Sequence, residues 1–179
     1  EDVMTMAKRS RKQVKKDENK VIRILQAYAK ESIDDLAKRC GFSGPKVRRI
    51  MKKLEDNETI WGYHAVTDFE KINMNEYVLL IKKANTPLDK LAKKIISREI
   101  DKKAHELDIM IGSSYYMHGI FDWLICFTAN DLPHAKKFES ELVKMYKPFI
   151  AETQLLENIF PVKRCGINNP HVGELEEFL

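Results

Sequence analysis

Residues 32–54 constrain this chain more than any other segment, because they predict two helices separated by a tight turn. The first helix begins at Ser32, a good N-cap residue, and carries a carboxylate three residues later at Asp35. Gly41 ends this helix, because glycine readily adopts the left-handed conformation that lets the chain turn. Ser43 is then placed to cap the second helix. Two helices joined by so short a turn are typical of a helix-turn-helix unit.

The second helix of this unit is strongly basic. Val47, Met51 and Leu54 form its apolar stripe, with Ile50 at the edge. Its outer arc carries five cations, and a major groove of DNA admits such a helix. A solvated basic face beside an ordinary helical hairpin is the alternative, but the helix pair and the charge agree in favouring DNA. The predicted DNA contacts are Ser43, Gly44, Lys46, Arg48, Arg49, Lys52 and Lys53.

The charge is distributed unevenly, which predicts two domains. Residues 1–60 contain 16 Lys and Arg against 10 Asp and Glu, whereas residues 61–179 contain 15 against 17. A basic N-terminal DNA-binding domain, called the head below, followed by a near-neutral second domain explains this asymmetry. We predict the following ranges: a tail over 1–16, the head over 17–58, a linking strand over 59–75, the second domain over 76–165 and a C-terminal tail over 166–179.

The flanks of the helix pair complete the predicted head. Apolar residues between Val21 and Ala29 have helical spacing, so the head has three helices. Residues 1–16 are basic and poor in apolar residues, which predicts a disordered tail. Such an arm either neutralises phosphates, enters a minor groove or is simply solvated. Thr59 to Val66 is rich in β-branched and aromatic residues and predicts a strand that leaves the head.

The second domain is predicted to run strand, helix, strand, strand, helix, strand, as in a ferredoxin-like βαββαβ domain. The strands are expected at 77–81, 109–117, 123–128 and 153–160, and the helices at 88–107 and from Asp131 onward. The fold class is therefore α+β. The first and third strands are apolar on both faces, whereas the helices cover only one face of the sheet. A second copy of the chain is the simplest cover for the other face, so we predict a homodimer.

Several functional classes find no support in the sequence. Cys40, Cys126 and Cys165 are odd in number and lack metal-ligand spacing, which disfavours disulfides and zinc and favours a cytoplasmic location. No apolar run reaches the roughly 20 residues of a membrane span. Phosphate-binding glycine loops and catalytic signatures are missing as well. We therefore expect no cofactor, no metal, no membrane partner and no enzymatic activity.

The motifs together resemble the leucine-responsive/asparagine regulator (Lrp/AsnC, feast/famine) family of prokaryotic transcription factors. In the head the resemblance depends on Ser32, Leu36-Ala37-Lys38-Arg39, Gly41 and Ser43, followed by Val47, Leu54-Glu55 and Ile60-x-Gly62-Tyr63. In the second domain it depends on Gly119-Ile120-Phe121-Asp122. The resemblance covers about residues 17–165. It implies sequence-directed DNA binding, dimers that can assemble into tetramers or octamers, and an amino-acid effector near the Gly-x-x-Asp turn.

The predicted effector site comprises Gly119, Asp122 and His118. Asp122 could accept the ammonium group of an amino acid, and Gly119 would let a ligand approach the backbone. The alternatives are a tight turn with a capping carboxylate for Gly119 and Asp122, and surface or interface packing for His118. The chain departs from the family where Ile50 replaces a usual Arg and Glu58 a usual Gly. Asn57 could supply the left-handed turn in place of that glycine.

Three functions follow, in order of preference. The first is a DNA-binding transcription regulator whose operator affinity a small molecule tunes. The second is a DNA-coating architectural protein, favoured by the basic tail and by the lack of Asn or Gln in the basic helix. The third is an enzyme that uses the same two-domain plan, which rests on analogy alone.

Overall fold

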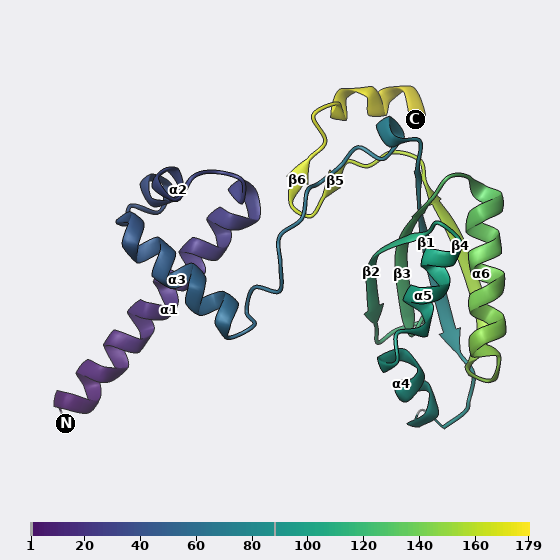
Figure 1. Ribbon diagram of the computed structural model, residues 1–179, viewed down its shortest axis with the longest axis horizontal. Coiled ribbons are helices and arrows are strands. Elements are labelled where there is room, and N and C mark those ends of the chain that lie inside the picture. The colour runs from purple at the N-terminus through teal and green to yellow at the C-terminus, as the bar shows by residue number, and fades with distance from the viewer. Residues whose placement is uncertain (1, 88) are drawn as a thin grey trace. The chain divides into compact units, whose positions relative to one another are not determined.

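The computed structural model (Figure 1) describes residues 2–87 and 89–179. The chain forms two compact units. Residues up to 66 make the first unit together with 162–177 and Leu179, and residues 67–161 make the second together with Phe178. We call the three-helix part of the first unit the head and the second unit the sheet domain.

The head consists of α1 (Asp2–Tyr28), α2 (Ile33–Cys40) and α3 (Gly44–Asp56). All three helices place apolar side chains in one core, because their apolar residues recur at helical spacing. The core consists of Val21, Leu25, Leu36, Ala37, Cys40, Val47, Ile50 and Leu54, all of them buried. The three-helix head predicted from the sequence is confirmed.

Helix α1 extends much further toward the N-terminus than predicted. The disordered tail expected over residues 1–16 is wrong for its described part, because α1 already begins at Asp2. Residues 10–16 contain no glycine or proline, and a helix that is already nucleated by packing extends at little cost. Gln13 Nε2 also donates a hydrogen bond to Asp17 Oδ1 one turn later, at 2.9 Å.

The linker after the head differs from its prediction. The expected strand from Thr59 to Val66 is absent, because this segment pairs with no strand in the described part of the chain. High β propensity does not make a strand without a partner to share backbone hydrogen bonds. The segment runs on to a short 3-10 helix, η1 (Glu70–Ile72), which ends at Asn73 in the left-handed conformation.

The sheet domain contains the predicted antiparallel sheet. Its strands are β1 (Asn75–Lys83), β2 (Met110–Tyr116), β3 (Trp123–Ala129) and β4 (Ile150–Asn158), in the spatial order β2-β3-β1-β4. Leu79 at the centre of β1 lies opposite Ile125 of β3 and Leu155 of β4. Figure 1 shows α4 (Asp89–Ile96), α5 (Glu99–Glu106) and α6 (Leu132–Tyr146) on one face of the sheet. The α+β class and the ferredoxin-like arrangement are confirmed.

The single long helix predicted over residues 88–107 is two helices. The chain breaks at Arg98, which adopts a left-handed φ of 54° between α4 and α5. Ser97 Oγ donates to the carbonyl of Lys94 at 2.8 Å, and such local hydrogen bonds compete with helix continuation. The predicted start at Leu88 lies outside the described residues.

The two faces of the sheet differ in how they are covered. Toward the helices, alternate residues of β1 and β3 such as Leu79 and Ile125 are fully buried, and Phe127 contacts Phe138 of α6 with ring centroids 4.8 Å apart. The opposite face carries apolar side chains beside polar ones such as Gln154 and Ser113, and no described helix packs on it. We call this the uncovered sheet face, and it comprises Val78, Leu80, Tyr115, Leu124, Cys126 and Leu156.

The chain after the sheet forms a small hairpin and a final helical turn. The hairpin pairs β5 (Lys163–Arg164) with β6 (Ile167–Asn168), and a 3-10 helix, η3 (Val172–Phe178), follows. Another 3-10 turn, η2 (Lys147–Phe149), joins α6 to β4. None of the helices in the described part of the chain is long and apolar enough to cross a membrane.

Candidate nucleic-acid interface and ligand turn

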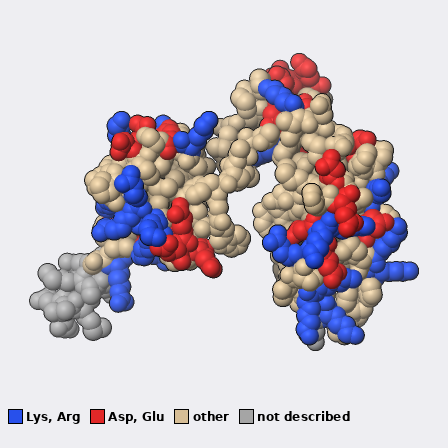
Figure 2. Space-filling model, viewed as in Figure 1, with Lys and Arg blue, Asp and Glu red and all other residues tan. Residues whose placement is uncertain are grey.

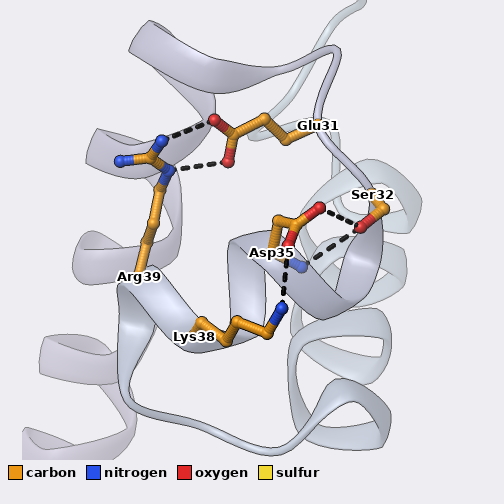
Figure 3. Close-up of polar contacts among 5 residues, drawn as sticks. All are labelled: Glu31, Ser32, Asp35, Lys38 and Arg39. Carbon is orange, nitrogen blue, oxygen red and sulfur yellow. Dashed lines mark hydrogen bonds and ion pairs between the residues drawn. The ribbon is translucent and has the colours of Figure 1, made fainter.

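Helix α2 begins with the cap that its sequence predicts (Figure 3). Ser32 Oγ accepts a hydrogen bond from the backbone N–H of Asp35 at 3.2 Å and donates one to Asp35 Oδ2 at 2.6 Å. Lys38 Nζ lies 3.0 Å from the other carboxylate oxygen. The pKa of Asp35 is therefore lowered, first by the Ser32 hydroxyl and then by Lys38. The Ser32 hydroxyl therefore caps the start of the helix, and the carboxylate of Asp35 accepts hydrogen bonds from that hydroxyl and from Lys38.

The cation at the end of α2 holds the corner between α1 and α2. Arg39 donates two hydrogen bonds to the carboxylate of Glu31, each 2.6 Å long (Figure 3). Its guanidinium also lies 3.8 Å from the ring centre of Tyr28. The hydrogen bonds to Glu31 raise the pKa of Arg39. A planar guanidinium that is both bidentate and stacked is fixed in position. Arg39 therefore positions the helices and is not free to contact DNA.

The turn between α2 and α3 has the predicted left-handed glycine. Gly41 has a φ of 62°, and its N–H donates to Lys38 while that of Phe42 donates to Ala37. Ser43 occupies the N-cap position of α3, but contrary to prediction its side chain makes no capping hydrogen bond. Gly44 lies close to α2, because a Cβ there would approach Asp34 Oδ1 to 3.1 Å. Gly44 thus has a packing role, and the hydroxyl of Ser43 is exposed.

One flank of α3 is neutralised by α1. Lys46 Nζ lies 2.7 Å from Asp17 Oδ2 and 3.8 Å from the ring centre of Phe42. Lys53 Nζ lies 2.6 Å from Glu18 Oε1. The hydrogen bond from Lys46 is the main reason why the pKa of Asp17 is lowered. Two of the five cations predicted to contact DNA are therefore engaged by carboxylates of α1.

The solvent-facing arc of α3 is different. Arg48 and Arg49 are exposed and have no carboxylate partner among the described residues. Lys52 beside them forms an ion pair with Asp56 at 3.1 Å, in which both side chains are largely exposed. Exposed pairs of this kind are weak and are easily exchanged for another anion. Figure 2 shows Lys and Arg gathered on the head near the start of α3, and Asp and Glu near its end.

The left-handed residue after α3 is not Asn57, as predicted, but its neighbour. Asn57 has a φ of −99°, so the left-handed residue is Glu58, with a φ of 59°. Glu58 stands where the Lrp/AsnC family usually has glycine. The left-handed backbone conformation is therefore kept by a residue with a side chain, which strains the backbone. Tyr63 in the linker donates a hydrogen bond to Glu55 at 2.7 Å, and burial raises its pKa to about 12.

The Gly-x-x-Asp turn in the sheet domain has a structural role. Asp122 Oδ2 accepts a hydrogen bond from the backbone N–H of Lys83 at 2.9 Å, and Asp122 Oδ1 lies 3.6 Å from Lys83 Nζ. The N–H of Asp122 donates to Ile81, and its carbonyl accepts from Met117. The turn is thereby fastened to the end of β1. One oxygen of the carboxylate is held only by a long ion pair, which a ligand ammonium group could replace.

Two other predicted residues lie at this turn. Gly119 has no atom within contact distance of an added Cβ, and His118 is exposed and has no partner in the described part of the chain. The described residues contain no group of three or more His, Cys, Asp or Glu that could hold a metal ion.

Sequence reasoning missed the carboxylates that neutralise α3. Asp17 and Glu18 precede the apolar residues from which the first helix of the head was predicted, but they lie inside α1 and contact residues about 30 positions away. No local spacing carries that information. The apolar stripes of α1 and α3 imply that the two helices pack together. That packing is the one signal that could have indicated these ion pairs.

Known proteins resemble this chain both in the head and over most of its length. Residues 18–60 match the model of a winged helix-turn-helix DNA-binding domain. The chain resembles an AsnC family transcriptional regulator from Agrobacterium tumefaciens, with a TM-score of 0.62 and 23% identity over 83% of this chain and 92% of that one. The chain has the fold of the Lrp/AsnC regulators. The resemblance predicted from the sequence motifs is therefore confirmed.

Two further relatives are informative. A transcriptional regulator from Neisseria meningitidis, solved in complex with L-methionine, has a TM-score of 0.64 and 17% identity over 83% of this chain and 92% of that one. The uncharacterised helix-turn-helix-type transcriptional regulator YugG of Bacillus subtilis is 22% identical over 142 residues, which are 76% of this chain and 80% of that protein. These relatives are named as transcription regulators and not as enzymes.

Proposed function

We propose that the chain is a sequence-directed DNA-binding transcription regulator that acts in the cytoplasm as a dimer or a larger assembly. The observation that carries this proposal is the pair of exposed arginines, Arg48 and Arg49, on the second helix of a helix-turn-helix unit. Arginine is the side chain that most often reads guanine in the major groove. The proposed contact set is Arg48, Arg49 and Lys52, with Ser43 at the start of the helix and Gly44, Lys46 and Lys53 supporting its position.

The test compares two variants with the same loss of charge. Arg48→Ala/Arg49→Ala removes the proposed reading side chains, and Lys136→Ala/Lys137→Ala removes two exposed cations of α6. Fluorescence anisotropy would measure the affinity of each variant for a duplex selected by the wild-type protein and for the same duplex shuffled. We expect the arginine variant to lose its preference for the selected duplex while the α6 variant retains it. If both variants prefer the selected duplex over the shuffled one to the same degree, the proposal is overturned.

The uncovered sheet face supports a dimer. Val78 lies opposite Cys126 and Leu156, and Leu80 lies opposite Leu124, so the apolar side chains form one continuous patch over three strands. Soluble proteins rarely leave such a patch in water, and twofold pairing is the commonest cover. A dimer would also carry two heads, which suits a pseudo-palindromic operator.

We further propose that a small molecule, an amino acid in the first instance, binds at the Gly119–Asp122 turn with His118 beside it. The supporting facts are the weakly engaged oxygen of Asp122 and the open space at Gly119. The Neisseria meningitidis neighbour was solved with L-methionine. A thermal-shift survey of L-amino acids, including L-methionine, would test this, because a ligand that binds the folded state raises the melting temperature.

Asp122→Asn is the variant for that survey, because an amide oxygen still accepts from the N–H of Lys83 but carries no charge. We expect the melting temperature of this variant to show no response to the amino acid that stabilises the wild-type protein, and its DNA affinity to be unchanged. A full response would place the ligand elsewhere.

A DNA-coating architectural protein is the second candidate. It is favoured by α3 itself, whose sequence from Gly44 to Asp56 contains no Asn or Gln to read adenine. The same anisotropy experiment separates the two functions. An architectural protein would bind the selected and the shuffled duplex with similar affinity and with a steep dependence on salt.

A further inference from the structure

We propose that the N-terminal half of α1 is a second DNA-contacting element, one that binds the sugar–phosphate backbone beside the groove that receives α3. This inference rests on the proposed function and extends it to a part of the chain outside the helix-turn-helix unit. The residues that carry it are Arg11, Lys12, Lys15 and Lys16, which belong to α1 and are all exposed.

These four cations have no role inside the protein. None of them forms an ion pair with any residue that the structure describes, and Val14 between them is itself exposed. No Asp or Glu occurs among residues 3–16, so the segment lacks the carboxylates that usually alternate with lysines on a solvated helix. Like charges three and four residues apart repel one another along a helix. Extension of the packed helix explains why this segment is helical but not why it is so basic, whereas an external polyanion does.

The position of the segment is fixed by the contacts of the next helical turn. Asp17 and Glu18 bind Lys46 and Lys53, so α1 crosses α3 at this point and residues 10–16 project beyond it. Figure 1 shows the N-terminal half of α1 extending away from α2 and α3. With a rise of about 1.5 Å per residue, Arg11 lies about 9 Å along the helix axis from Asp17. The cations therefore begin where α1 meets α3 and extend about 9 Å along α1 away from that contact.

The charge density of this segment matches that of duplex DNA. The four cations lie within six residues, a length of about 8 Å along the helix. The same length of duplex carries about five phosphate charges. Lysine and arginine side chains are long enough to reach phosphates from a helix that lies across a strand, and such contacts fix the register of the protein without reading bases. The element would therefore add affinity and position to a reader whose base contacts come from α3.

The test measures the salt dependence of DNA affinity in the full-length chain. One variant replaces Arg11, Lys12, Lys15 and Lys16 with Gln, which keeps good helix propensity. The matched control replaces Lys90, Lys93, Lys136 and Lys137 with Gln, which removes the same charge from exposed positions of α4 and α6. For each protein, anisotropy with the selected and the shuffled duplex gives the slope of log K against log salt concentration, and circular dichroism monitors the helix.

We expect the α1 variant to lose about two to four units of slope, at about 0.9 unit for each phosphate contact, with equal loss on both duplexes. The control should keep the wild-type slope. Amide hydrogen exchange over residues 10–16 of the wild-type chain should slow when the duplex binds.

The outcomes separate the two proposals. An unchanged slope in the α1 variant, or unchanged exchange over residues 10–16, would overturn this inference and leave the reading role of α3 intact. A loss confined to the selected duplex would also overturn it, because backbone contacts do not discriminate sequence. If the wild-type chain binds neither duplex, the proposed function itself fails.

Discussion

The head and the sheet domain differ in the kind of surface that they leave without a partner. The head leaves cations without anions, because Arg48 and Arg49 on α3 and the four cations of α1 have no carboxylate partners among the described residues. The sheet domain leaves apolar area without cover, along Val78 and Leu80 of β1 and their neighbours. Charge attracts a polyanion over a distance, whereas apolar surface needs a close-fitting partner. This difference is the reason for proposing two different partners, DNA for the head and a second copy of the chain for the sheet domain.

The same comparison applies within α3. Lys46 and Lys53 are engaged by Asp17 and Glu18, whereas Arg48 and Arg49 are not. Counting cations along the sequence cannot separate these classes. The first class ties α3 to α1, and the second has no carboxylate partner among the described residues.

A charge placed on the uncovered sheet face should have the largest effect. Leu80→Arg puts an unpaired guanidinium on each side of the proposed dimer interface, and a buried unpaired charge costs about 3–5 kcal/mol. Light scattering should show a dimeric wild-type protein and a monomeric variant. Leu132→Arg, at an exposed leucine on the helical side, is the control and should remain dimeric. A monomeric wild-type protein would show that this face has some other cover.

The two classes of cation on α3 should differ next. Arg49→Ala should weaken binding to the selected duplex by about 1–3 kcal/mol if the side chain reaches a base. Lys53→Ala should weaken it less, because Lys53 already forms an ion pair with Glu18. Anisotropy at roughly 150 mM salt, near physiological screening, measures both. Similar losses in the two variants would remove the distinction between paired and unpaired cations.

Relief of strain at the end of α3 should have a smaller effect. Glu58 has a φ of 59°, and glycine adopts this conformation without the steric cost of a Cβ. Glu58→Gly should raise the free energy of unfolding by about 1 kcal/mol, measured by urea denaturation. Glu58→Ala removes the same carboxylate and keeps the Cβ, so it should give no gain. Identical behaviour of the two variants would mean that charge and not backbone conformation decides stability here.

The smallest effect concerns the ion pair between Asp17 and Lys46. The pKa of Asp17 is lowered below its usual 3.8, chiefly by the hydrogen bond from Lys46. A carboxylate with a lowered pKa stabilises the folded state above its unfolded pKa, and this stabilisation is lost as the pH falls through the folded pKa. The stability advantage of wild type over Asp17→Asn should therefore be present near pH 6 and should be lost as the pH falls below 3.8 and through the lowered pKa of Asp17 in the folded state. A constant difference across that range would contradict a charged pair.

Local patterns in the sequence predicted most of the fold. The apolar stripes of α2 and α3 and the glycine at Gly41 define the helix-turn-helix unit within one stretch of chain. The alternation of strands with helices predicted the βαββαβ order, and the structure confirms it. These features are recoverable because each depends on residues that are close in sequence.

The remaining features depend on contacts that are distant in sequence or on strain. Thr59 to Val66 has the composition of a strand but has no partner strand in the described chain. The break at Arg98 and the left-handed Glu58 place residues in conformations that their types disfavour. At the candidate interface, the sequence identified the cations of α3 but not their partners, because Asp17 and Glu18 reach them only through the packing of α1. The Gly119–Asp122 turn was located from its motif, but the hydrogen bond from Lys83 to Asp122 joins the end of β1 to this turn and has no local signature.

The central claim is that Arg48 and Arg49 on α3 read DNA sequence. The most direct test incubates the purified wild-type protein and the Arg48→Ala/Arg49→Ala variant with fragmented genomic DNA of the host at roughly 150 mM salt and sequences the bound fragments. We expect the wild-type protein to give a small number of sharp peaks over pseudo-palindromic sites, and the variant to lose those peaks while keeping weak, diffuse binding. Sharp peaks that persist in the variant, or a wild-type protein that retains no DNA, would contradict the claim.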